Sequence, residues 1–212
     1  MGVVSKCLIS AGPTREWIDA VRFLSNPSTG KMGYALASEA KKVGLEVTLV
    51  SGPVCLPPPP GVTLIKVESA LEMREAVLEE FQNSELVIMS AAVSDHRPDF
   101  LSFEKLKKDK FPDQLKLIRN PDILAELGEI KLPSQTLVGF AAETEDHLLH
   151  ARSKLITKNL DWIVLNDIGS PLTGFDSDTN EVTLLSRNEE SVSLKISTKT
   201  EIASGILEII WK

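Results

Sequence analysis

The chain has 212 residues, of which 42% are apolar and 25% are charged; this is ordinary globular usage and excludes a disordered or fibrous protein. The length corresponds to one large domain, with or without an appendage. The chain has 23 basic and 30 acidic residues, which gives a net charge of −7. This charge argues against binding to nucleic acid or an anionic membrane through overall electrostatic attraction, so an anionic ligand needs a local basic cluster.

Short apolar strands alternate with amphipathic helices along most of the chain. The alternation predicts strands at residues 6–10, 45–50, 62–67, 85–91, 135–140 and 161–165, and helices at 31–43, 70–82, 144–159 and 198–211. Capping boxes, formed by Ser69 with Glu72 and by Thr198 with Glu201, are expected to open the second and the last helix. Asn120 as N-cap and Pro121 as first helical residue predict a further short helix.

The alternation indicates an α/β, Rossmann-like fold with a mostly parallel sheet and helices on both faces. Two alternating runs at 181–185 and 191–196 predict a late antiparallel hairpin, spanning 181–196 as a whole. Residues 97–118 are charged and show no period, so we expect a flap there within a single domain covering 1–212. In such sheets ligands bind outside the carboxyl ends of the strands.

Two cysteines and the absence of long apolar runs bear on the location of the protein. Cys7 and Cys55 are too few for a disulfide framework or a four-cysteine zinc site, and each is expected to be a small buried residue in a reducing cytoplasm. No apolar run reaches the roughly 18 residues of a membrane span. The beginning of the sequence is too short and too soon polar for a signal peptide.

Several common site motifs are absent or incomplete. The sequence contains no G-x-G-x-x-G, and Gly30-Lys31 departs from a P-loop because Ser25 and Met32 stand at two of its defining positions. His147 and His150 are three residues apart on a predicted helix, but no third ligand is evident, so we interpret them as surface residues.

The first loop, residues 10–33, is long enough to suggest a function. Residues 28–30 are placed to present backbone N–H groups at a helix N-terminus, and Arg15 and Arg22 are available to pair with the same anion. The alternative is a surface loop whose arginines pair with its own acidic residues.

Basic residues gather in two later segments. Six lie between Lys105 and Arg119, which fits either a mobile cover over a polyphosphate or a solvated charge run. Lys154 and Lys158 are four residues apart, so they share one helical face and are able to hold a phosphate between them. Asp95, just beyond a predicted strand, is placed to accept from an amino or hydroxyl group or to cap a turn.

Taken in order, these segments resemble the phosphopantothenoylcysteine synthetase family. The resemblance runs from about residue 10 to residue 180. It is carried by SAGPTRE (10–16), DxVR (19–22), SNxSxGKMG (25–33), SGPV (51–54), AAVxDxRP (91–98), EKxKK (104–108), NPDIL (120–124), VGFAAET (138–144), ARxK (151–154), KNLD (158–161), ND (166–167) and GFDSDxN (174–180).

The resemblance implies a cytoplasmic ligase of coenzyme A biosynthesis. It would join phosphopantothenate to L-cysteine through an acyl-cytidylate, using CTP with Mg²⁺ and releasing CMP and pyrophosphate. A homodimer is expected, in which loops of each subunit contribute to the partner's site. No flavin is expected, and the preceding decarboxylation would belong to a separate chain.

The resemblance also implies site residues. Asn26 and Lys105 would be catalytic, with Asn26 supporting the cysteine step. The nucleotide would be bound by Ala92, Asp95, Lys105, Asn120, Pro121, Asp122, Ile123, Phe140, Lys154 and Lys158. The acyl substrate would be bound by Gly12, Arg15, Asn26, Ser28 and Gly30. No dedicated metal ligand is expected. Pro27 and Trp17 depart from the family pattern.

Two other functions remain open on the sequence alone. One is a nicotinamide-nucleotide-binding oxidoreductase on a similar sheet, although the glycine fingerprint of such enzymes is missing. The other is a non-catalytic nucleotide-binding module. Physical reasoning from the residues alone leaves CTP and ATP as alternatives; the preference for CTP comes from the resemblance.

Overall fold

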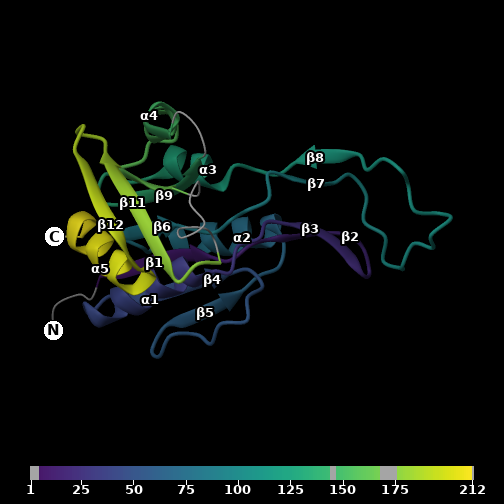
Figure 1. The fold of residues 1–212 in the computed structure, drawn as a ribbon, viewed down its shortest axis with the longest axis horizontal. Coiled ribbons are helices and arrows are strands. Elements are labelled where there is room, and N and C mark those ends of the chain that lie inside the picture. Colours follow the sequence, from purple (N-terminus) through teal and green to yellow (C-terminus); the bar gives the residue numbers. More distant parts are fainter. Residues whose placement is uncertain (1–4, 144–146, 168–175, 212) are drawn as a thin grey trace.

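The computed structural model describes residues 5–143, 147–167 and 176–211. Its centre is an eight-stranded sheet in the order β12-β11-β10-β9-β6-β1-β4-β5 (Figure 1). The strands are β1 Lys6–Ala11, β4 Glu46–Ser51, β5 Thr63–Lys66, β6 Leu86–Met89, β9 Thr136–Glu143, β10 Trp162–Asp167, β11 Thr179–Ser186 and β12 Ser191–Thr198. β11 and β12 are antiparallel additions to an otherwise parallel sheet, which confirms the predicted fold class and the late hairpin.

Helices cover both faces of the sheet and bury a separate core against each. α1 (Lys31–Lys42) and α5 (Lys199–Ile210) pack side by side on one face, and α2 (Ala70–Phe81), α3 (Ile123–Ile130) and α4 (His147–Thr157) lie on the other (Figure 1). All four residues of β6 are buried, as expected for a central parallel strand. Within the described residues, no helix is long and apolar enough to cross a membrane.

The capping box at the start of α5 is present as predicted. The Thr198 side chain accepts from the backbone N–H of Glu201, and the Glu201 carboxylate accepts from the backbone N–H of Thr198. Thr198→Ala is therefore expected to destabilise the protein by about 1 kcal/mol. Thermal unfolding should show a Tm lower by about 2–4 °C. Thr200→Ala, an exposed neighbour in the same turn, should lack this effect, and an equal loss would contradict the capping role.

Two helix starts differ from the predictions. α3 begins at Ile123, and its N-cap is Asp122, whose carboxylate accepts from the backbone N–H of Ala125. The predicted cap, Asn120, is wrong because its amide is used elsewhere: it donates to the Ser94 carbonyl and accepts from Arg97.

At α2, only half of the predicted capping box forms. Ser69 accepts from the Glu72 backbone N–H, as predicted, but the Glu72 carboxylate accepts from the backbone N–H of Glu68 instead of that of Ser69. The two cysteines also differ from each other. Cys7 is buried, and burial raises the pKa of its thiol, whereas Cys55 is exposed, so the prediction that it is buried was wrong.

The first loop contains a β-hairpin that the sequence patterns did not predict. It consists of β2 (Arg15–Asp19) and β3 (Arg22–Ser25). Asp19 closes the turn by accepting from the backbone N–H groups of Val21 and Arg22, each at 2.9 Å. Trp17 and Phe23 are cross-strand partners with ring centroids 5.0 Å apart in an edge-to-face arrangement, a favourable pair.

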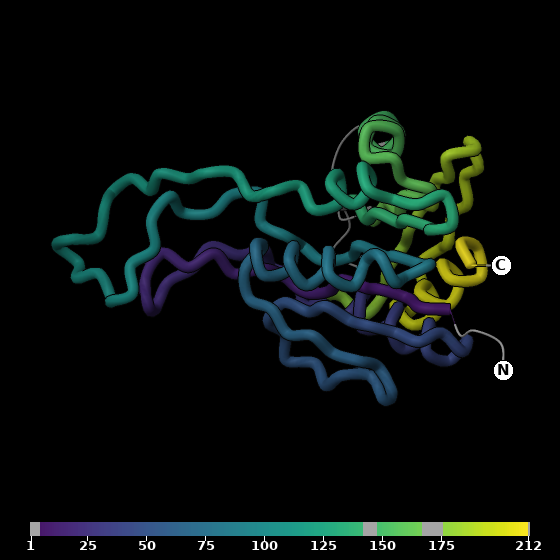
Figure 2. Tube along the Cα trace, turned by 180° about the vertical axis from the view of Figure 1, so that it is seen from behind, coloured from purple at the N-terminus to yellow at the C-terminus, as the bar shows by residue number. Residues whose placement is uncertain are grey.

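The predicted flap region forms a long projecting segment, residues 96–119, which we call the arm. Its base is the two-stranded ribbon of β7 (His96–Pro98) and β8 (Leu117–Arg119). The arm and the β2–β3 hairpin project together from the body of the molecule, as both views show (Figures 1 and 2). Whether the arm closes over a ligand stays a prediction.

Candidate functional site

The strand order reverses between β1 and β6, which is where ligands bind in open α/β sheets. The chain passes from β1 outward to β4 and β5, and then returns to β6 on the other side of β1. A first cavity of about 530 Å³ opens beyond the carboxyl ends of these strands. Among the residues predicted to bind the nucleotide, those that line it are Asp95, Asn120, Pro121, Asp122, Ile123, Phe140 and Lys158.

A second cavity of about 320 Å³ adjoins the first. Ala91, Val93, Asp95 and Phe140 line both cavities and form the wall between them. Of the predicted residues, the second cavity contains Asn26, Ser28, Gly30, Ala92 and Lys154. The structure therefore brings most of the predicted nucleotide residues and three of the predicted acyl-substrate residues to these two adjoining cavities, which we together call the hollow.

Lys158, at the rim of the first cavity, is held in place by an ion pair with Asp122. Lys158 Nζ lies 2.9 Å from Asp122 Oδ1 and 2.7 Å from Asp122 Oδ2. The same carboxylate caps α3, so it anchors the lysine to a fixed helix end. A phosphate entering this cavity meets a lysine that is already held at the rim, and it has to share or displace the Asp122 carboxylate.

Asn26 is fixed at the edge of the second cavity by backbone acceptors. Its Nδ2 donates to the carbonyls of Ala92 at 3.1 Å and Val93 at 3.3 Å. The preceding residue, Ser25, donates from Oγ to the Thr14 carbonyl at 2.7 Å. The Ser25 bond closes the base of the hairpin, and the Asn26 bonds tie its end to the segment that follows β6, so the Asn26 amide is held beside the wall shared by the two cavities.

Two glycines allow α1 to begin close to the end of β1. Gly30, the N-cap of α1, has a φ of +76°, and a Cβ there would lie 2.8 Å from Val54 Cγ1 and 3.3 Å from Gly12 Cα. Gly12 has a φ of +74° and the same close neighbour, Val54. A side chain at either position would be strained and would collide with Val54. Gly12 lines neither cavity, so its observed role is close packing.

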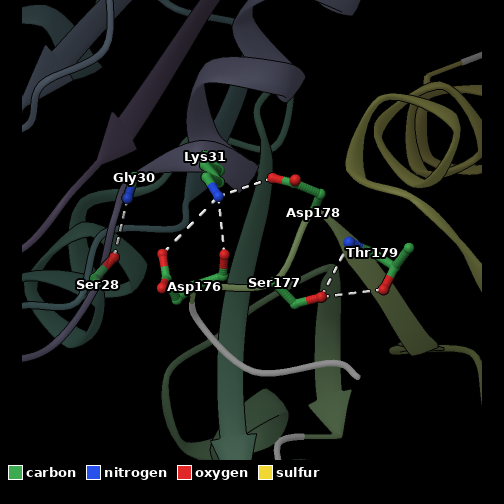
Figure 3. Close-up of polar contacts among 7 residues, drawn as sticks. All are labelled: Ser28, Gly30, Lys31, Asp176, Ser177, Asp178 and Thr179. Carbon is green, nitrogen blue, oxygen red and sulfur yellow. Dashed lines mark hydrogen bonds and ion pairs between the residues drawn. The ribbon is translucent and has the colours of Figure 1, made fainter. Parts of the chain in front are cut away.

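The second cavity also contains polar residues that the site prediction missed, among them Lys31, Asn166, Asn180 and Lys199. Lys31 Nζ donates to Asp178 Oδ1 and to the Asp176 carbonyl, both at 2.8 Å, and thereby ties the start of α1 to the segment before β11 (Figure 3). The hydrogen bond with Asp178 raises the pKa of Lys31 and lowers that of the Asp178 carboxyl.

Lys199 and Asn166 each place a polar group in an enclosed position. Lys199 is only 7% exposed, and burial, followed by repulsion from Lys31, lowers its pKa. Asn166 Oδ1 is buried and has no hydrogen-bond partner in the described part of the chain. Such an acceptor is suited to a ligand that brings an N–H or O–H donor. Lys31, Asn166 and Asn180 belong to quoted motifs, whereas the position of Lys199 depends on how α5 packs against α1.

Arg15 and Lys105 are not brought to either cavity. The Arg15 guanidinium lies 3.7 Å from Glu68 and 4.6 Å from the Phe23 ring centroid. Lys105 is exposed on the arm. Within one chain, Lys154 and Lys158 line the hollow, whereas Lys105 does not. For Lys105 to contact a ligand there, either the arm has to move or the arm of a neighbouring subunit has to supply it.

The fold and the site place the chain among α/β proteins with a mostly parallel sheet and a lysine-lined hollow at the switch point, a setting whose charge is suited to anionic ligands. Comparison with known families is more specific. The family model described as DNA/pantothenate metabolism flavoprotein C-terminal domain matches residues 4–212. The chain belongs to this family.

Individual relatives agree with this assignment. The chain is 50% identical over 204 residues to the coenzyme A biosynthesis bifunctional protein CoaBC of Bacillus subtilis, covering 96% of this chain and 50% of the relative. It is 45% identical over 210 residues to CoaBC of Vibrio cholerae, covering 98% and 52%. The chain therefore spans about half the length of these curated relatives. The crystal structure of a CoaBC C-terminal domain superimposes with a TM-score of 0.84 at 45% identity, covering 97% of this chain and 93% of that one.

Proposed function

We propose that this chain is a phosphopantothenate–cysteine ligase that uses CTP and acts in coenzyme A biosynthesis. The observation that carries the proposal is the pair of adjoining cavities, because they contain most of the residues that the family resemblance assigns to the nucleotide and three of those it assigns to the acyl substrate. Relatives at 45–50% identity named for coenzyme A biosynthesis support it.

The arrangement suits activation of a carboxylate. A carboxylate is a poor acyl donor until it carries a good leaving group. In the proposed reaction, its oxygen attacks the α-phosphorus of CTP and pyrophosphate leaves; the cysteine amine then attacks the acyl carbon and CMP leaves. We assign the nucleotide to the first cavity and the acyl substrate to the second, so that the acyl phosphate forms at the shared wall containing Asp95 and Phe140.

Charge neutralisation in this scheme falls to lysines and to Mg²⁺. Lys158 and Lys154 line the two cavities on either side of the shared wall. Asp95 supplies one carboxylate there, and no group of three potential metal-ligating side chains occurs within 5–143, 147–167 and 176–211. This donor set fits an ion that would be held mainly by nucleotide phosphates and water, with Asp95 as the nearby protein carboxylate, and that would neutralise phosphate charge.

The proposed enzyme is a cytoplasmic homodimer in which the arm of one subunit reaches the hollow of the other. Support comes from the arm itself, which carries Phe100, Leu101, Phe103 and Leu117 with 42–88% of their surfaces exposed. Apolar groups exposed along a projecting segment are typical of a surface that is covered in an assembly. Such a dimer would give Lys105 access to a nucleotide.

The direct test supplies the purified protein with phosphopantothenate, Mg²⁺, cysteine and each common ribonucleoside triphosphate in turn. Pyrophosphate and CMP are expected with CTP, and the amide product should appear in equal amount. No pyrophosphate with any nucleotide would refute the ligase, and a preference for ATP would refute the nucleotide assignment. Tight NADPH binding that CTP does not affect would favour the oxidoreductase instead.

Lys158→Ala is expected to weaken nucleotide binding while leaving the fold intact. Loss of one charge-assisted contact of about 1.5–3 kcal/mol corresponds to a roughly 10- to 150-fold higher Kd for CTP. Isothermal titration with CTP measures it. Lys195→Ala removes the same charge from the exposed side of β12 and should leave the Kd unchanged; an unchanged Kd for Lys158→Ala would contradict the assignment.

A further inference from the structure

Asp19 is a fully buried carboxylate that lies outside both cavities. One of its oxygens accepts the two backbone N–H groups that close the β2–β3 turn. The other oxygen, Oδ2, accepts from the backbone N–H of Leu106 at 3.1 Å, across 87 residues of sequence. Since a turn needs only the first oxygen, the second bond marks Asp19 as a link to the arm.

Arg22 completes the hold on Leu106. Its Nη2 donates to the Leu106 carbonyl at 3.2 Å, and its Nη1 lies 3.5 Å from Asp19 Oδ2. The N–H and the C=O of one arm residue are therefore both bound by one ion pair of the hairpin, an arrangement that we call the Leu106 clamp. Lys105 is the residue directly before the clamped position.

Two further contacts hold the same part of the arm to the hairpin. The Ser102 backbone N–H donates to the Ile18 carbonyl at 3.1 Å, and the Arg22 guanidinium lies 4.1 Å from the Phe111 ring centroid. Between β7 and β8 the arm has no helix or strand of its own. Its conformation near Lys105 is thus set by the hairpin rather than by local secondary structure.

The charge state of Asp19 is compatible with a permanent clamp. Burial opposes ionisation of the carboxyl, but the backbone N–H groups of Val21 and Leu106 and the Arg22 guanidinium outweigh it, so the pKa of Asp19 lies below its usual value. The carboxylate stays charged throughout the neutral range.

We propose that Asp19 is a positioning residue for Lys105: through the Leu106 clamp it fixes the backbone next to Lys105 before ligands bind. The inference rests on the proposed function, in which Lys105 acts on the nucleotide or the acyl intermediate. A lysine on an unrestrained loop would have to be ordered at each turnover, whereas a clamped one is presented in a constant place.

A double-mutant cycle on pyrophosphate release tests whether Asp19 acts through Lys105. Asp19→Asn should lower kcat/KM for CTP on the order of tenfold in the otherwise unchanged enzyme, but less than about twofold in the Lys105→Ala background. Equal factors in both backgrounds would overturn the proposal, as would a Lys105→Ala enzyme with full activity. Asp99→Asn, which breaks an exposed ion pair with Lys116 at the base of the arm, is the matched control. It should leave kcat/KM for CTP unchanged.

Limited trypsin digestion gives a readout that does not depend on the reaction. Cutting after the lysines at 105–110, identified by mass spectrometry, should accelerate several-fold in Asp19→Asn because the open arm is more populated. Leu106→Pro removes the donated N–H without changing the hairpin turn, and it is the second variant if Asp19→Asn folds poorly. It should reproduce the kinetic effect and the faster cutting after Lys107, Lys108 and Lys110, whereas the bond between Lys105 and the new proline resists trypsin and is left out of the comparison.

The outcomes separate the inference from the proposed function. If the unmodified enzyme releases no pyrophosphate, the function fails, and the trypsin comparison alone decides whether Asp19 fixes the arm. If pyrophosphate is released normally and neither Asp19→Asn nor Leu106→Pro changes kinetics or cleavage, the function stands and the clamp is refuted.

Discussion

Replacing Asn26 with aspartate is expected to slow amide formation by on the order of 100-fold, while pyrophosphate release falls less than about tenfold. The Asn26 amide is held beside the shared wall by the carbonyls of Ala92 and Val93. When cysteine attacks in the proposed reaction, negative charge grows on the acyl oxygen, and the Asn26 amide would stabilise it by turning one N–H from a backbone carbonyl to that oxygen. A carboxylate has no donor and would repel that charge, whereas the first half-reaction is centred on the α-phosphorus.

The measurement compares the two half-reactions directly. Pyrophosphate release is followed in a single turnover without cysteine, and amide formation is followed after cysteine is added. Asn188→Asp, the same substitution in the exposed turn between β11 and β12, should leave both rates unaltered. An equal loss in both half-reactions would show that Asn26 binds substrate uniformly and has no special part in the cysteine step.

Gly52→Ala is expected to destabilise the folded protein strongly, by about 3 kcal/mol or more. A Cβ at this position would lie 1.7 Å from the Pro13 carbonyl oxygen, and both groups belong to backbone that cannot swing aside. Gly52 also donates to the Ala11 carbonyl at 3.0 Å. Because Pro13 pairs with Ala92, the displacement should reach the second cavity as well.

Chemical denaturation of Gly52→Ala measures this loss. Gly44→Ala is the matched control, because Gly44 has a φ of +91° and nothing within 4 Å of an added Cβ. It carries only backbone strain, of about 1 kcal/mol. If Gly52→Ala is no less stable than Gly44→Ala, the backbone around Pro13 can move to accept the added Cβ, and the prediction is wrong.

The strands and helices of the sheet were predictable because their signals are local. β6 is a continuous apolar run, and α5 opens with a capping box. The start of α3 was not predictable, because Asn120 and Asp122 are both good N-caps and only the tertiary contacts of Asn120 decide between them. The hairpin at 15–25 was missed because Asp19 makes a turn without glycine or proline in it.

The site was predictable to the extent that it follows from strand order. Asp95 lies beyond the carboxyl end of β6, where strand order predicts a ligand site, and it lines the first cavity. Asn120 reaches the same cavity from the end of β8, in the separate two-stranded ribbon, which strand order does not predict. The surroundings of Lys105 depend on a contact 87 residues away in sequence, and Lys199 reaches the second cavity only through the packing of α5 on α1. Long-range packing of this kind leaves no local pattern.

The contrast between the two cysteines makes the chain convenient for site-selective labelling. The chain has no other thiols, and thiol reagents attack the thiolate, which the raised pKa of buried Cys7 suppresses. Maleimide dyes therefore attach at Cys55 alone, without engineering. The adjacent Val54 occupies the space that a Cβ at Gly12 or Gly30 would need, so a fluorophore on Cys55 should report on the junction where the first loop meets α1.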